Sequence, residues 1–196
     1  IEAGLRTWDL QHPFPEEANR VIAGKLAHWH FAATQGARQN LLKEGVASGD
    51  IFVTGNTVID ALLMTAASEV EIGLDLDPSK RLVLVTAHRR EHFGEPFRSI
   101  CRALRTLAEN NPQVQFLYPV HPNPNIQQVA QASLAGIAHF RLCAPLDYAA
   151  FAAAMKAAYF ILTDSGGVQE EAPALGKPVL VMRDETERPE AVEQGG

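Results

Sequence analysis

From Lys80 onward, short apolar runs rich in β-branched residues alternate with longer stretches of helical character. The expected strands cover residues 81–86, 114–118, 138–142, 158–163 and 178–182. The expected helices between them cover residues 96–109, 124–132, 147–156 and 167–175. Strands joined in this way are typical of a parallel sheet, and runs that are apolar throughout indicate burial on both faces. The pattern therefore predicts a doubly wound α/β domain.

The first part of the chain repeats this pattern more weakly. Helices are expected over residues 17–28, 35–44 and 58–67, and extended segments over residues 29–33 and 51–54. Gly55 interrupts the pattern, so we expect a domain boundary near it, with residues 1–55 as the C-terminal part of a first α/β domain and residues 56–196 as most of a second. The chain opens without methionine and closes in mid-pattern, so we expect a piece of a longer protein.

Charge and hydropathy exclude several classes of partner. Lys and Arg number 17 against 23 Asp and Glu, and the net charge of -6 argues against a general affinity for nucleic acid or anionic membranes. No apolar run reaches the roughly 18 residues of a membrane span, and no signal peptide is recognisable. Cys101 and Cys143 lack metal-type spacing and fit small buried side chains in a reducing compartment. We therefore expect a cytoplasmic protein that binds any anionic ligand at a local site.

The sequence Ser165-Gly166-Gly167 lies between the end of an expected strand and the start of an expected helix. Free backbone N–H groups and the positive end of the helix dipole converge at such a turn, which predicts an anion site. Glu171, further along the helix, is placed to accept two hydrogen bonds from a ribose diol. A helix start that binds no ligand remains the alternative.

His88 follows another expected strand and precedes Arg89 and Arg90. A histidine in this place is a candidate contact for a diphosphate and a candidate proton carrier, and a solvated charged loop is the alternative. His121 also follows a strand, and the prolines beside it favour a rigid turn.

Acidic residues also lie near the start of the chain. Glu16 and Glu17 follow Pro15 and fit the acidic first turn of a helix, an interpretation that leaves Glu2 and Gly4 unexplained. His28 and His30 have the spacing of two metal ligands on a strand, but no third ligand follows them, so we expect no metal site.

Five blocks of the sequence resemble the non-hydrolysing UDP-N-acetylglucosamine 2-epimerases. They are EAGLRT at 2–7, PEEANR at 15–20, TGNTVIDAL at 54–62, TAHRRE at 86–91 and DSGGVQEEAPALGKPVLVMRDETERPEA at 164–191. The resemblance implies two Rossmann-like domains of GT-B type and a homodimer. It also implies an isomerase that interconverts UDP-GlcNAc and UDP-ManNAc without a cofactor, by eliminating UDP to a 2-acetamidoglucal and adding it back.

The resemblance also implies roles for individual residues. Glu2, Glu16 and His88 correspond to catalytic residues. The residues expected to bind the substrate are Glu2, His88, Phe151, Ser165, Gly166, Gly167, Glu171 and Arg188. Some bacterial relatives bind a second UDP-GlcNAc as activator, which here would contact Glu16, Arg89 and His121.

The chain departs from the family pattern at two points. Leu146 stands where relatives often have Gln, so a side-chain contact to the uracil would be lost there. An important aspartate that precedes the EAGLRT block in relatives lies outside the sequence.

Three other functions stay open. A retaining GT-B glycosyltransferase shares the Gly-Gly turn and the ribose carboxylate but needs an acceptor, and the EAGLRT and TAHRRE blocks argue against it. A hydrolysing epimerase would release UDP and free N-acetylmannosamine. A nucleotide-binding module would bind UDP without turnover.

Overall fold

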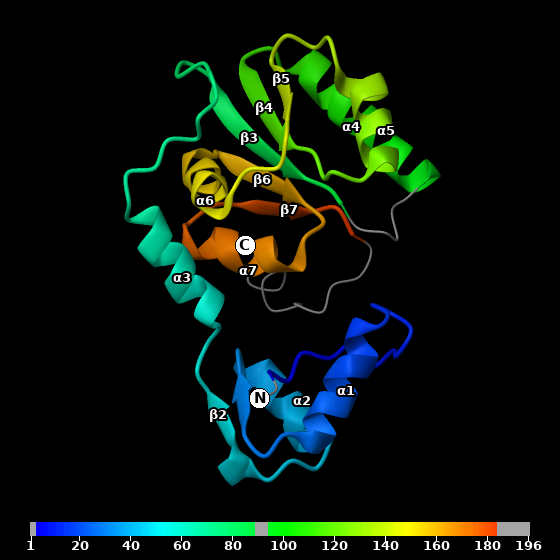
Figure 1. Ribbon diagram of the computed structural model, residues 1–196, viewed down its shortest axis with the longest axis vertical. Helices are drawn as coiled ribbons and strands as arrows, with labels where there is room; N and C mark the ends of the chain where they lie inside the picture. Colours follow the sequence, from blue (N-terminus) through cyan, green and yellow to red (C-terminus); the bar gives the residue numbers. More distant parts are fainter. Residues whose placement is uncertain (1–2, 89–93, 184–196) are drawn as a thin grey trace. The chain divides into compact units, whose positions relative to one another are not determined.

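Figure 1 shows the computed structural model, which describes residues 3–88 and 94–183. The chain divides into two compact units between Ala61 and Leu62, inside helix α3 (Thr57–Ala66). The division falls later than Gly55 because Leu62 is already buried in the core of the second unit. Each unit is described by itself below.

Five strands form the parallel sheet of the second unit, in the order β5-β4-β3-β6-β7. They are β3 (Arg81–Thr86), β4 (Val114–Pro119), β5 (Phe140–Cys143), β6 (Phe160–Thr163) and β7 (Val179–Val181). The helices of this unit are α4 (Glu95–Asn110), α5 (Pro124–Leu134), α6 (Tyr148–Ala157) and α7 (Gly166–Ala174). The α/β fold class predicted from the alternating runs is confirmed.

Helices cover both faces of this sheet (Figure 1). Val83 and Val85 of β3 pack into one core together with α4 and α5. Leu82 and Leu84 of the same strand pack into a second core with α6 and α7. Successive strand residues point to opposite faces, so a strand buried on both faces must be apolar throughout. The continuous apolar runs in the sequence follow from this arrangement.

Two strands, β5 and β6, begin two residues later than the sequence predicts. β5 begins at Phe140 rather than at residue 138, because the N–H of Phe140 donates to the carbonyl of Ile137 and closes a turn. β6 begins at Phe160 rather than at residue 158, because the N–H of Ala158 donates to Ala154 O and ends α6. In both places a local hydrogen bond closes the preceding turn or helix just before the strand begins.

Over residues 3–61, the first unit contains two short parallel strands, β1 (His30–Ala32) and β2 (Ile51–Val53). Its helices are α1 (Glu16–Leu26), α2 (Gln35–Lys43) and the short 3-10 helix η1 (Ser48–Asp50). The core of this unit is formed by Ala32, Ala37, Leu41 and Ile51.

The segment that precedes α1 is fixed against α2. Gly4 has a φ of +75°, and a Cβ at this position would lie 2.4 Å from the carbonyl oxygen of Ala37, so only glycine fits. Arg6 donates to both carboxylate oxygens of Glu44, at 2.7 and 3.0 Å. This hydrogen bonding from Arg6 lowers the pKa of the Glu44 carboxyl.

Over residues 3–88 and 94–183, no helix combines the length and the hydrophobicity needed to cross a bilayer.

Candidate active site

The site lies at the carboxyl edge of the sheet, between β3 and β6. The chain moves from β3 to β4 on one side and returns to β6 on the other, which makes this edge the switch point where open parallel sheets bind ligands. Thr86 and Thr163 end the two strands in register, and their buried hydroxyls hydrogen-bond each other. The loops that begin at Ala87 and Asp164 therefore start side by side, from two strand ends that are bonded to each other.

A cavity of about 350 Å³ opens beside this switch point. Its lining residues are Thr86, Ala87, His88, Pro119, His121, Pro122, Pro145, Leu146, Tyr148, Phe151, Ser165, Val168 and Glu171. The size and the mixture of apolar walls with a few polar groups are typical of small-molecule sites. The cavity brings together five residues that the sequence predicts for substrate or activator binding: His88, His121, Phe151, Ser165 and Glu171.

The predicted Gly-Gly turn begins helix α7, with Ser165 at its N-cap. The N–H of Ser165 donates to Thr163 Oγ1 at 2.9 Å, so this group is used within the protein. The Ser165 hydroxyl makes no capping bond, and the N–H groups of Gly166 and Gly167 have no helical carbonyl to bind. The turn thus offers one hydroxyl and the first N–H groups of a helix to an anion.

Gly167 leaves open space next to two polar side chains. A Cβ at this position would lie 3.6 Å from Glu171 Oε2 and 3.9 Å from Ser165 Oγ, which are ordinary contacts. The fold itself therefore tolerates a larger residue here. The glycine keeps clear the space between the helix start and the Glu171 carboxylate.

Glu171 is buried, and desolvation raises the pKa of its carboxyl. The hydroxyl of Tyr148 donates to its Oε1 at 3.2 Å, while Oε2 faces Gly167. The sequence does not identify Tyr148, because its role depends on how α6 and α7 meet. Its place directly after the helix-capping Asp147 is the local signal that could have indicated it.

His88 lies at the end of β3 with its side chain 43% exposed. Its backbone N–H donates to Oδ2 of Asp164 at 2.9 Å, and its Nδ1 lies 3.3 Å from Oδ1. The ring of His121 stacks on it at a centroid distance of 6.0 Å and an angle of 14°. His121 Nδ1 accepts from the N–H of Asn123, which leaves its Nε2 for other contacts.

The apolar wall of the cavity includes Phe151 and Leu146. Phe151 comes from α6 and is partly buried, as a surface for a planar base requires. Leu146, the residue that departs from the family pattern, lies on the same wall and can offer only its apolar side chain or its backbone.

Two acidic residues at the start of α1 have different environments. Glu16 is exposed, whereas Glu17 is fully buried and accepts from the N–H groups of Thr7 and Trp8 at 2.9 and 3.1 Å. Arg20 also contacts Glu17 at 3.2 Å. Glu17 therefore holds the preceding loop, whereas the carboxylate of Glu16 is exposed to solvent.

Three predicted site residues, Glu2, Arg89 and Arg188, lie outside the described residues.

His28 and His30 are the pair that has the spacing of metal ligands in the sequence. Among the residues that are described, no group of three or more His, Cys, Asp and Glu side chains could hold a metal ion. His30 is buried and His28 is exposed, so the two side chains of this pair lie in different environments.

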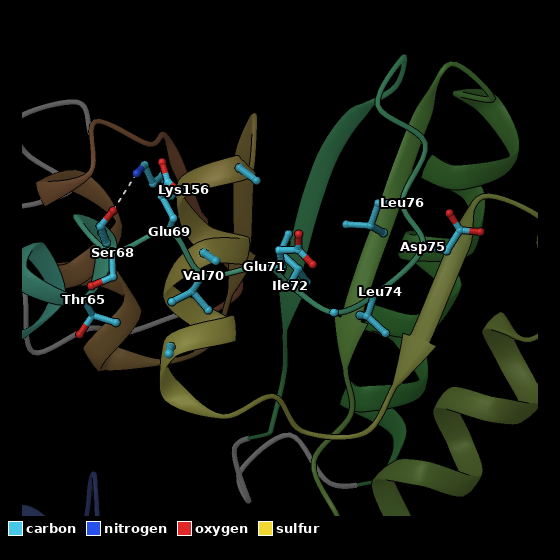
Figure 2. Close-up of a pocket in the computed structure, with 15 residues that line it drawn as sticks. Thr65, Ser68, Glu69, Val70, Glu71, Ile72, Leu74, Asp75, Leu76 and Lys156 are labelled. Atoms are coloured by element: carbon cyan, nitrogen blue, oxygen red, sulfur yellow. Dashed lines mark hydrogen bonds between the residues drawn. The ribbon is translucent and has the colours of Figure 1, made fainter.

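A larger groove of about 1030 Å³ runs between the segment after α3 and helix α6 (Figure 2). Lys156 crosses it and donates to the carbonyl of Ala66 at 2.7 Å. Within the described part of the chain, this groove shares no lining residue with the cavity at the switch point. The switch-point cavity, which contains the predicted residues, is therefore the candidate site.

Comparison with known proteins shows the family of the chain. The chain matches the family described as UDP-N-acetylglucosamine 2-epimerase over residues 1–196. The UDP-N-acetylglucosamine 2-epimerase of Yersinia pestis is 54% identical over 100% of this chain and 54% of its own length, and that of Escherichia coli K12 is 52% identical over the same shares. The chain thus spans about half the length of the curated relatives it matches.

Solved structures give the same result. The UDP-GlcNAc 2-epimerase of Neisseria meningitidis bound to UDP-GlcNAc matches with a TM-score of 0.93 and 43% identity, over 100% of this chain and 55% of that one. The S. aureus MnaA–UDP structure matches with a TM-score of 0.92 and 46% identity, over 100% and 54%. The chain belongs to the UDP-N-acetylglucosamine 2-epimerase family.

Proposed function

We propose that the full-length protein interconverts UDP-GlcNAc and UDP-ManNAc at the cavity between β3 and β6, without net hydrolysis. The observation that carries this proposal is the convergence of the α7 N-terminus, His88 and the buried Glu171 on one cavity. The relatives named above carry the same enzyme name, and one of their structures is bound to UDP-GlcNAc.

The chemistry of the reaction explains why the enzyme needs a site that binds the diphosphate. The proton at C2 of the sugar is not next to a carbonyl group, so a base alone cannot remove it at a useful rate. When the C1–O bond to UDP breaks, positive charge develops at C1 and the C2 proton becomes acidic. UDP leaves with the bonding electrons, a base takes the C2 proton, and the neutral product is 2-acetamidoglucal. Return of the proton to the opposite face and re-addition of UDP complete the epimerisation.

Each part of the cavity suits one part of the substrate. The N–H groups of Gly166 and Gly167 and the Ser165 hydroxyl would hold the diphosphate. Glu171 would hold the ribose diol through Oε2, since Tyr148 already binds Oε1. Phe151 would pack on the uracil.

His88 would contact the departing diphosphate and stabilise its developing charge. Glu2 and Glu16 would serve as the acid and base on the two faces of C2, and Arg188 would contact the substrate further out. The activator site with Glu16, Arg89 and His121, the homodimer and the cytoplasmic location also stay predictions from the resemblance.

The test is to incubate the full-length protein with UDP-GlcNAc in deuterated water, without an acceptor, nicotinamide or added metal. We expect UDP-ManNAc that carries deuterium at C2, with no accumulation of free UDP. Free UDP formed in step with N-acetylmannosamine would show a hydrolysing enzyme instead. Turnover only with an acceptor would show a glycosyltransferase, and binding without turnover would show a nucleotide-binding module.

A further inference from the structure

The carboxylate of Asp164 contacts His88 at two points. Oδ2 accepts the backbone N–H of His88 at 2.9 Å, and Oδ1 lies 3.3 Å from the ring nitrogen Nδ1. The side chain of Asp164 is 0% exposed, whereas that of His88 is 43% exposed. One buried side chain thus contacts both the backbone and the ring of the histidine that lines the cavity.

Asp164 is itself held in place by the two strand ends. Its backbone N–H donates to the carbonyl of Thr86 at 3.1 Å. The neighbouring Thr163 hydroxyl bonds that of Thr86 and accepts the N–H of Ser165. The carboxylate therefore projects from a backbone that is fixed on both sides. The fixed position of this carboxylate therefore determines how the His88 ring is oriented.

We propose that Asp164 is a positioning residue, which keeps a proton on Nδ1 of His88 so that Nε2 is the nitrogen that meets the substrate diphosphate. This inference rests on the proposed function, because it states which ring nitrogen of His88 faces the diphosphate in the proposed reaction. A carboxylate beside one ring nitrogen fixes the tautomer and stabilises the imidazolium when the other nitrogen is protonated. The Nδ1–Oδ1 distance exceeds that of a well-aligned hydrogen bond, and such contacts often tighten only when substrate binds.

A purely structural role for Asp164 makes a different prediction. The bond from Oδ2 to the His88 backbone could simply shape the loop after β3. In Asp164→Asn the amide oxygen can still accept that N–H, but the negative charge and the second acceptor are lost. The substitution therefore keeps the acceptor for the backbone N–H and replaces the acceptor that faces Nδ1 of the ring by an amide donor.

The first experiment compares turnover of UDP-GlcNAc by the full-length protein and its variants. Asp164→Asn should lower kcat by on the order of 100-fold or more, with KM changed less than about 3-fold. In a His88→Gln background the same substitution should lower kcat by less than about 3-fold, because Asp164 acts through His88. An undiminished effect in that background, or a kcat that Asp164→Asn leaves unchanged, would overturn the proposal.

The second experiment reads the ring directly and needs no turnover. Long-range ¹H–¹⁵N spectra of histidine-labelled protein, with His88 assigned by its absence in His88→Gln, show which nitrogen carries the proton. We expect a protonated Nδ1 in the wild type and loss of this preference in Asp164→Asn. A wild-type His88 protonated on Nε2 alone refutes the proposal, even if Asp164→Asn fails to fold. If UDP-GlcNAc is not epimerised at all, the proposed function fails while this spectrum still decides the position of the proton.

Tyr118→Phe is the matched control. The buried Tyr118 hydroxyl donates to the carbonyl of Ala87 at 2.6 Å, so this variant loses a hydrogen bond to the same loop without touching the His88 ring. We expect lower thermal stability, an unchanged His88 tautomer and a kcat within about 3-fold of the wild type. A loss of kcat as large as that of Asp164→Asn would show that the integrity of the loop, rather than the Asp164 carboxylate, is what matters.

Discussion

The hydroxyl of Tyr148 on α6 donates a hydrogen bond to Oε1 of Glu171 on α7, at 3.2 Å. Both residues line the cavity between β3 and β6. The contact fixes one oxygen of the carboxylate and leaves Oε2 toward Gly167, where the ribose of a nucleotide would lie. Two helices that meet only in the folded chain thus orient one carboxylate of the cavity.

Tyr148→Phe should weaken UDP binding, because Glu171 loses the partner that orients it. One hydrogen bond of this kind corresponds to a fall in affinity of about 3- to 10-fold, measured by calorimetry. Tyr159→Phe is the control, since Tyr159 is exposed and does not line this cavity. Equal UDP affinity in wild type and Tyr148→Phe would contradict the orienting role.

Glu171→Gln should raise thermal stability at neutral pH while it weakens UDP binding. Burial raises the pKa of Glu171 above the 4.5 of a free side chain. The folded state then binds more protons than the unfolded state between those two pKa values, so the contribution of Glu171 is most favourable below 4.5 and is lost as pH rises. Glutamine has no such dependence, so the difference in melting temperature should vanish in acid. A constant difference from pH 4 to pH 8 would contradict this assignment.

Gly167→Ala and Gly167→Val should impair binding more than folding. A Cβ would make only ordinary contacts at this position, so alanine should change the free energy of unfolding by less than about 1 kcal/mol. The added carbon would occupy the space where a phosphate approaches the helix start. We expect UDP affinity to fall by about 10-fold or more, and further for valine than for alanine. Unchanged affinity in the valine variant would argue against a phosphate at this turn.

Glu17→Gln and Glu16→Gln should separate folding from catalysis. Glu17 is buried, and a glutamine in its place keeps one oxygen for the N–H groups of Thr7 and Trp8 but loses the negative charge beside Arg20. This substitution should lower the free energy of unfolding by about 2 kcal/mol. Glu16 is exposed, so Glu16→Gln should keep the wild-type melting temperature and lose turnover. Chemical denaturation and a turnover assay on both variants check this. If Glu16→Gln lowers stability and Glu17→Gln abolishes only turnover, Glu17 is the catalytic residue and Glu16 the structural one.

The sheet of the second unit could be predicted because its strands are buried on both faces. A run such as residues 82–85 is apolar at every position, and few other structures accommodate that pattern. The ends of the strands were less predictable. The turn that delays β5 to Phe140 depends on one hydrogen bond to Ile137 that sequence periodicity does not reveal.

The polar residues of the site were predictable only where a strand end or a helix start marks them. Ser165 and His88 follow strands, and both line the cavity. Asp164 and Tyr148 act across elements, through contacts to His88 and Glu171, and the local sequence does not reveal those contacts. Nor can sequence decide which of two adjacent glutamates is buried, since Glu16 and Glu17 fit the first turn of a helix equally well.

The most direct test of this account is a crystal structure of the full-length protein with UDP. The account predicts that the diphosphate contacts the N–H groups of Gly166 and Gly167 and the Ser165 hydroxyl, with Glu171 bound to the ribose and Phe151 beside the uracil. UDP bound elsewhere, with the cavity between β3 and β6 empty, would contradict it.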